Sequence, residues 1–208
     1  MDNNIDLIQE TLKTDGDYNQ ALLEETCLID LLTEEEKKSI NELTSVIRFE
    51  KGTILTREGQ VSNECYHILE GCARQYYLVD GEEKTTFFYT EGQSISSSIG
   101  TSAGIPSRHY IEVTEDSMMS IMKAEDENTL YKRHPRMESM CRISLEQELK
   151  KQQDILVHYM ISTPEERYLN LLKTRPELLN RVPQYQLASY LGVKPESLSR
   201  IRKRLAMK

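Results

Sequence analysis

Two side chains of opposite charge lie four residues apart near the carboxyl end of the sequence, in the stretch LGVKPESLSRIRKRLAMK. They are Glu196 and Arg200, and on a helix this spacing places them on one face. The carboxylate can accept a hydrogen bond from an amine, and the guanidinium can donate two parallel bonds to a flat pair of acceptors. The pair is therefore suited to recognising the edge of a planar polar molecule.

Positive charge is concentrated at the same end of the sequence. From Lys194 onward there are six Lys and Arg residues and one acid, so the last 15 residues carry +5. Because the whole 208-residue chain carries −8, the residues before Lys194 carry −13. The two parts are therefore expected to meet different partners.

The residues around the charged pair have the spacing of a helix-turn-helix. Ala188 is small where two helices would touch, and Gly192 permits a positive φ in the turn. Pro195 suits the first position of the second helix, where its missing amide costs nothing. Apolar residues would hold both helices to a core, namely Leu187, Leu191, Val193, Leu198 and Ile201. This arrangement predicts a DNA-binding unit whose second helix enters the major groove.

On that second helix the predicted base-reading residues are Glu196, Ser197, Ser199 and Arg200. Glutamate can accept from the amine of cytosine and arginine can donate twice to guanine, so Glu196 and Arg200 are the main candidates. The neighbouring cations are expected to contact phosphates and to supply affinity rather than sequence choice. They are Lys194, Arg202, Lys203 and Arg204. A solvated charged face is the alternative for a basic helix, but the turn geometry favours DNA binding.

The middle of the sequence has the pattern of antiparallel strands. Between residues 45 and 122, short runs rich in Val, Ile, Tyr, Phe and Thr are punctuated by glycines, and Asp80-Gly81 is typical of a hairpin turn. Regular turns predict a jelly-roll-like β-roll. After Pro135 the pattern becomes helical. The expected fold class is α+β, with an N-terminal antiparallel β-roll, a long dimerisation helix and a C-terminal helix-turn-helix domain.

Capping-box patterns mark two helix starts, one at Thr33 with Glu36 and one at Thr163 with Glu166. We expect four segments: a helical extension over residues 1–30, a β-roll domain over 31–133, a connecting helix over 134–162 and the helix-turn-helix domain over 163–208.

An apolar stripe follows the connecting helix to about residue 161. Beyond Cys141 its members are Leu145, Leu149, Gln152, Leu156 and Tyr159. Such a stripe can pack on its own domain, but its length of more than six turns favours a seam between two copies of the chain. We therefore expect a homodimer.

Other classes of protein have little support in the sequence. No run approaches the roughly 18 apolar residues of a membrane span. The start MDNNIDLIQE lacks the features of a signal peptide, so a cytoplasmic location is expected. The cysteines form no CxxC pair and no cluster with His, which leaves free thiols as the expected state and redox sensing or metal binding as the alternatives. No catalytic residue, metal site or cofactor is predicted.

The order of these elements resembles the Crp/Fnr family of bacterial transcription regulators. The stretches FEKGTILTREGQ, CYHILEGCARQYYL and PSRHYIEVTEDS, with the helix-turn-helix segment, carry the likeness over about residues 30–206. The last segment is similar to the branch of the family common in Bacteroidetes. The resemblance implies a cyclic-nucleotide-binding-like sensor domain, a homodimer on a palindromic operator and contact with RNA polymerase. It also matches Glu196 and Arg200 to the family's base-reading residues.

The resemblance also locates a candidate effector pocket. In cyclic-nucleotide-binding members a glycine and a glutamate hold the ribose, and an arginine and a serine hold the cyclic phosphate. The matching positions here are Ser96, Ser97, Ser107 and Arg108, so the ribose carboxylate is missing and the arginine comes one place late. In an extended segment that shift reverses the side chain's direction. A response to cyclic AMP is therefore not expected; another small effector or a plain polar turn are the alternatives.

Two other functions compete with the regulator hypothesis. A β-roll can house a cupin-like, metal-dependent active site, but only His67 and His109 fall in the expected roll and no HxH pair exists. The roll can also be an effector-free scaffold for the DNA-binding unit. The sequence favours a regulator that is not an enzyme.

Overall fold

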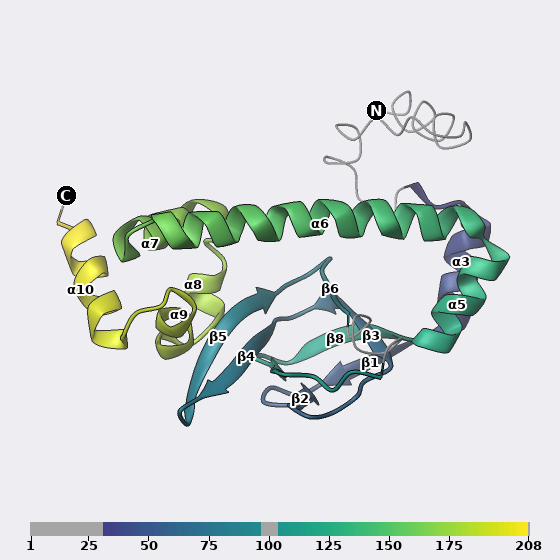
Figure 1. Ribbon diagram of the computed structural model, residues 1–208, viewed down its shortest axis with the longest axis horizontal. Coiled ribbons are helices and arrows are strands. Elements are labelled where there is room, and N and C mark those ends of the chain that lie inside the picture. Colours follow the sequence, from purple (N-terminus) through teal and green to yellow (C-terminus); the bar gives the residue numbers. More distant parts are fainter. Residues whose placement is uncertain (1–30, 97–103, 208) are drawn as a thin grey trace. The chain divides into compact units, whose positions relative to one another are not determined.

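The computed structural model describes residues 31–96 and 104–207 of the chain, and Figure 1 shows the order of their elements. The chain forms two compact units. Of the described residues, one unit comprises 31–44 and 125–153, and the other comprises 45–96, 104–124 and 154–207. The expected α+β class, with an antiparallel roll that precedes the helices, is confirmed. The helices expected within residues 1–30 lie outside the described residues.

In the described residues, the β-roll consists of two four-stranded sheets. One sheet has the order β1-β8-β3-β6 and the other has the order β2-β7-β4-β5, and β3–β8, β4–β5 and β4–β7 pair antiparallel. The strands are β1 (Thr44–Phe49), β2 (Ile54–Thr56), β3 (Glu64–Glu70), β4 (Ala73–Val79), β5 (Glu82–Tyr89), β6 (Ser94–Ser96), β7 (Tyr110–Val113) and β8 (Ser117–Lys123). Because β5 ends its sheet, one of its edges is available to another part of the chain.

Alternating burial along the strands builds the core of the roll. In β3, Tyr66 and Ile68 are buried while their neighbours are less so, as expected for a strand with one face inward. The buried members of the core are Leu55, Tyr66, Ile68, Ala73, Ile95, Ile111, Val113 and Met119. The β4–β5 hairpin turns at Asp80 and Gly81, whose φ values of 53° and 79° suit a two-residue hairpin. The hairpin predicted from Asp80-Gly81 is confirmed.

Within residues 31–96 and 104–207, three helices lie wholly or mainly in the first unit: α3 (Glu34–Leu43), α5 (Ala124–Arg133) and α6 (Pro135–Ile161). The capping box of α3 is present, because Thr33 Oγ1 accepts from the Glu36 amide and the Glu36 carboxylate accepts from the Thr33 amide. The sequence pattern did not predict α5. The predicted end of the connecting helix at residue 161 is confirmed.

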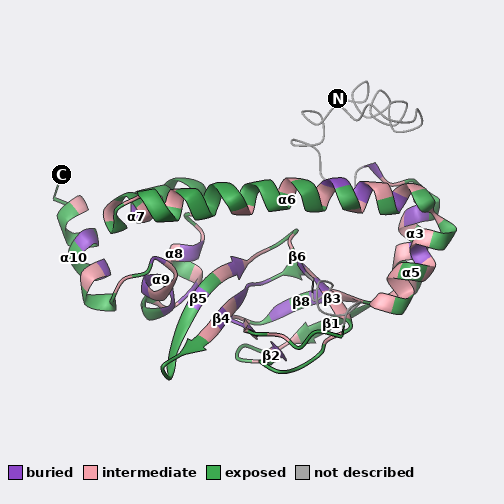
Figure 2. Cartoon of the chain, viewed as in Figure 1, coloured by how far each residue is buried: buried purple, intermediate pink, exposed green. Residues whose placement is uncertain are grey.

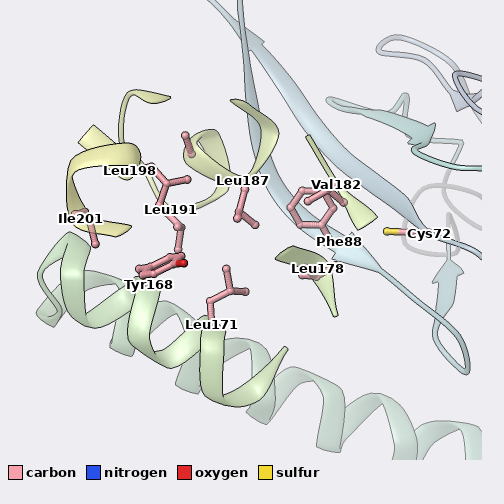
Figure 3. Close-up of a cluster of buried hydrophobic side chains, with 11 residues drawn as sticks. Cys72, Phe88, Tyr168, Leu171, Leu178, Val182, Leu187, Leu191, Leu198 and Ile201 are labelled. Atoms are coloured by element: carbon pink, nitrogen blue, oxygen red, sulfur yellow. The ribbon is translucent and has the colours of Figure 1, made fainter. Parts of the chain in front are cut away.

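The C-terminal part contains α7 (Pro164–Thr174), α8 (Leu178–Arg181), α9 (Gln184–Tyr190) and α10 (Pro195–Leu205). The predicted capping box between Thr163 and Glu166 opens α7. Figure 3 shows the buried cluster that these helices share. The cluster includes Phe88 and Cys72 of the β-roll together with Tyr168, Leu171, Leu178, Val182, Leu187, Ala188, Leu191, Leu198 and Ile201. The C-terminal helices and the outer side of the roll therefore have one common core.

Candidate DNA-binding surface

The turn between α9 and α10 has the geometry that a helix-turn-helix needs. Gly192 has a φ of 68°, a conformation that glycine adopts without strain. The chain then reverses so that the Val193 amide bonds to the Ala188 carbonyl at 2.9 Å. Ala188 is fully buried, which lets the two helices approach each other closely. The roles predicted for Ala188 and Gly192 are thus present in the structure.

Apolar contacts fix the rotation of α10 about its own axis. Leu198 and Ile201 are buried, with 0% and 7% exposure, and both pack in the common core. Leu187 and Leu191 hold α9 to the same core, and Val193 packs against it while half-buried. Because residues three and four apart share a helix face, burial of Leu198 and Ile201 turns the opposite face of α10 outward.

That outward face carries the predicted base-reading residues. Glu196, Ser199 and Arg200 are exposed, and Ser197 is half-buried. Pro195 takes the first helical position after Lys194, as predicted. Ser199 also has a partner that the sequence did not suggest, since Nε2 of Gln184 donates to its Oγ at 2.7 Å.

The predicted phosphate contacts line the same helix. Lys194, Arg202 and Lys203 are exposed, and no hydrogen bond or ion pair of their side chains appears in the described part of the chain. Arg204 is exposed as well, but its guanidinium forms an ion pair with Glu165 in the first turn of α7. Three of the four cations are therefore positioned to meet an anionic partner without giving up an ion pair.

Arg167, which was not among the predicted site residues, links the turn between α9 and α10 to the end of α6 by hydrogen bonds. Its Nε donates to the Leu191 carbonyl at 3.0 Å, and its Nη1 donates to the carbonyls of Tyr159 and Ser162 at 3.1 and 3.0 Å. The guanidinium also lies 4.4 Å from the centre of the Tyr159 ring. A Cβ at Gly192 would lie 2.0 Å from the Tyr159 hydroxyl, so the aromatic ring closes over the turn.

A second set of contacts joins the C-terminal helices to the β-roll. Arg181 of α8 donates to the carboxylates of Glu91 and Glu115, with Nε to Glu115 at 2.9 Å and Nη1 to Glu91 at 2.8 Å. Arg175 donates to the Phe88 carbonyl at 2.8 Å. At the edge of the sheet, Ser189 of α9 accepts from one backbone amide of β5 and donates to a carbonyl of the same strand. Here α9 covers part of the open edge of β5.

Glu91 is held as a carboxylate by these contacts. Hydrogen bonds from the Arg181 guanidinium lower the pKa of Glu91 to about 2, and bonds from the backbone, including the Gly71 amide, add to the effect. A depressed carboxyl pKa stabilises the folded chain above the unfolded pKa of about 4.3, and this contribution is lost as pH falls towards 2. The contact between α8 and the roll should therefore weaken in acid.

Replacing Arg181 by alanine should lower the free energy of unfolding at pH 7 by about 1 to 3 kcal/mol, because two partly exposed carboxylates lose their partner. Between pH 5 and 2, the free energy of unfolding should also fall less in the variant than in the wild type, because the contribution of the Arg181–Glu91 contact is already absent. Urea unfolding monitored by circular dichroism at pH 7 and pH 3 measures both effects. Arg48→Ala is the matched control, because Arg48 pairs with Asp116 at an exposed site. Equal losses in the two variants would contradict the role given to Arg181.

Comparison with known proteins supports the architecture. Residues 46–134 match the family model of the cyclic nucleotide-binding domain. None of the curated protein sequences matches the chain. Several solved structures are similar to it over most of their length. The chain has the Crp/Fnr fold.

Three of these structures illustrate the likeness. The c-di-GMP responsive global regulator CLP of Xanthomonas campestris is 16% identical with a TM-score of 0.66, covering 84% of this chain and 92% of its own. A putative transcriptional regulator of the crp/fnr family from Eubacterium rectale is 18% identical with a TM-score of 0.65, covering 88% and 87%. FixK2 from Bradyrhizobium japonicum is 19% identical with a TM-score of 0.64, covering 79% and 85%. The likeness to the Bacteroidetes branch stays a prediction.

The long helix of this Crp/Fnr fold carries an exposed apolar stripe. Leu145, Leu149 and Leu156 are 61%, 60% and 59% exposed, and Figure 2 shows most of α6 after its first turns in green. Gln152, a further member of the predicted seam, is half-buried and donates to Glu148 at 2.7 Å. Tyr159 is 42% exposed while it also covers the Gly192 turn. None of the helices in the described residues is both long and apolar enough to cross a membrane.

Only part of the candidate effector pocket can be placed in the Crp/Fnr fold. Ser97 lies outside the described residues, and Ser96 is the last residue of β6. The Ser107 hydroxyl bonds to the backbone of His109, and Arg108 is exposed. In residues 31–96 and 104–207 no group of three His, Cys, Asp or Glu side chains is arranged to hold a metal ion. The pocket and its effector stay predictions.

Proposed function

We propose that this protein is a sequence-specific DNA-binding transcription regulator, and that it acts as a homodimer on a palindromic operator. The observation that carries the proposal is the outward face of α10. Glu196 and Arg200 are exposed on it while Leu198 and Ile201 anchor the opposite face in the core. A helix held in this way can enter the major groove without rearranging its own core.

Each exposed group on α10 has a distinct role in this proposal. Arg200 donates two hydrogen bonds to O6 and N7 of guanine, and Glu196 accepts from N4 of cytosine. Each contact discriminates against a wrong base pair by about 1 to 3 kcal/mol. Lys194, Arg202 and Lys203 bind phosphates, and they contribute affinity that falls as salt rises.

The homodimer is supported by the exposed leucines of α6. Leu145, Leu149 and Leu156 recur with the spacing of a two-helix seam. A continuous row of large apolar side chains, each about 60% exposed, is typical of a surface that another chain covers. Two copies joined in this way present two recognition helices, which match the two halves of a palindrome.

The β-roll is proposed to act as the sensor, with an effector that is not cyclic AMP. The relative from Xanthomonas campestris is described as c-di-GMP responsive, which is a statement about that protein. The alternative is an effector-free scaffold. A thermal-shift screen of the full chain against nucleotides and small anions separates the two, because a ligand of the folded state raises the melting temperature. Contact with RNA polymerase is proposed from the family resemblance, and the cytoplasmic location expected from the sequence is retained as a proposal.

Arg200→Ala is expected to relax the choice of one base pair in each half-site, because the bidentate donor to guanine is removed. Binding sites are first selected from a random DNA pool, and affinities for the selected duplex and its single-base-pair variants are then measured by fluorescence anisotropy. Discrimination at that base pair should fall about 5- to 150-fold, as a loss of about 1 to 3 kcal/mol requires.

Lys203→Ala serves as the comparison on the same helix. It should weaken binding to all duplexes by a similar factor and lower the slope of log affinity against log salt by about 1. A wild-type chain that recovers no common sequence from the pool would overturn the proposed function.

A further inference from the structure

A hydrogen bond across the helix-turn-helix links two exposed side chains of different helices. Gln184 is the first residue of α9, and Ser199 lies on the outward face of α10, 15 residues later. Nε2 of Gln184 donates to Oγ of Ser199, and the two atoms are 2.7 Å apart. Both residues are exposed, so this contact is not needed to fill the core.

The contact determines what Ser199 can still offer to a ligand. A hydroxyl has one hydrogen to donate and two lone pairs that accept, whereas the NH₂ of a glutamine amide only donates. With the amide bonded to Oγ, a lone pair of Ser199 is occupied and its O–H is free to donate. Ser199 and Glu196 lie three residues apart, so they share one stretch of the helix surface.

We infer that Gln184 is a positioning residue that makes Ser199 a hydrogen-bond donor towards DNA. The inference rests on the proposed function, since it assumes that α10 enters the major groove. A donor there pairs with acceptors on the base edges, namely N7 and O6 of guanine, N7 of adenine or O4 of thymine. Gln184 thereby selects the class of base at one position of each half-site without touching that base itself.

The variant Gln184→Glu tests whether residue 184 determines if Ser199 donates or accepts a hydrogen bond. A carboxylate at residue 184 accepts from the Ser199 hydroxyl, so Ser199 would then face the DNA with lone pairs alone. Base choice at that position should move towards amine donors, which are N4 of cytosine and N6 of adenine. The variant should fold normally, because acidic residues are favourable in the first turn of a helix. Circular dichroism melting checks this expectation.

The measurement is the ratio of affinities for duplexes that differ only at the base pair facing Ser199. That base pair is identified first as the one whose discrimination Ser199→Ala reduces. We expect Gln184→Glu to change the ratio by about five- to tenfold in favour of the donor base, within the range that one base contact supports. Gln184→Ala should weaken the preference without reversing it.

The new negative charge will also weaken binding to every duplex, and the double variant Gln184→Glu with Ser199→Ala corrects for this effect. Its affinity ratio at that base pair should equal that of Ser199→Ala alone. A Gln184→Glu variant that loses the same factor on every duplex would overturn the inference, as would a shifted preference that persists in the double variant. Either outcome leaves the proposed function intact, whereas a wild-type chain without sequence preference rejects both.

Discussion

Replacing Leu149 and Leu156 by aspartate should turn the proposed dimer into a monomer and lower its affinity for a palindromic operator by about 100-fold or more. Each leucine is close to 60% exposed in the single chain, and burial of such a side chain contributes about 1.5 to 3 kcal/mol. An aspartate in the seam would instead have to lose its hydration. A monomer binds only one half-site. It lacks the high effective concentration that tethering gives to the second recognition helix of a dimer.

The oligomeric state and the affinity for the operator are measured separately. Light scattering after gel filtration gives the molar mass in solution, and fluorescence anisotropy gives the affinity for full and half operators. Lys150→Asp is the control, because it introduces the same side chain on the charged side of α6. A double variant that keeps the mass of the wild-type and its affinity would exclude α6 as the dimer seam.

Gly71→Ala is expected to lower the free energy of unfolding by about 2 to 6 kcal/mol. A Cβ at this position would lie 2.1 Å from Oγ and 2.7 Å from Cα of Ser117, and the φ of 109° is strained for any residue with a side chain. Hydrogen bonds hold Gly71 and Ser117 in place, so neither residue can easily move to make room for the Cβ. Gly71 donates its amide to Glu91, and Ser117 Oγ accepts from the Cys72 amide while it donates to the Glu115 carbonyl.

Thermal and urea unfolding measure the effect, and Gly81→Ala supplies the matched control. Gly81 also has a positive φ, 79°, but a Cβ there would have no atom within 4 Å. The control should therefore report backbone strain alone, at about 1 to 2 kcal/mol. If the two variants lose the same stability, the collision with Ser117 does not contribute and the expectation is wrong.

Local signals explain which parts of the fold could be predicted. The capping boxes at Thr33 and Thr163, the hairpin at Asp80-Gly81 and the turn at Gly192 each depend on a few neighbouring residues. Helix α5 could not be predicted in this way, because its ten residues have only one buried side chain, Leu130, and so lack a clear apolar repeat. The charges at its ends, acidic at the start and basic at the finish, were the available signal.

In the candidate site, too, features that depend on neighbouring residues could be predicted, whereas contacts between distant residues could not. The exposure of Glu196 and Arg200 followed from the spacing of apolar residues on their own helix. The partners of Arg181 could not be predicted, because Glu91 and Glu115 are 90 and 66 residues away in the sequence. The contact between Gln184 and Ser199 is also invisible to a periodicity argument, since it joins two polar side chains across a turn.

The fully buried Phe88 has a consequence for engineering. Its ring meets that of Tyr190 edge-on with centroids 5.3 Å apart, inside the cluster that supports α9 and α10. The helix-turn-helix of α9 and α10 is thus completed by strand β5, which lies about 100 residues earlier in the sequence. A chimaera that exchanges only this segment between relatives would inherit a hole or a collision at that ring, so specificity is better altered by point substitutions on α10 than by grafting.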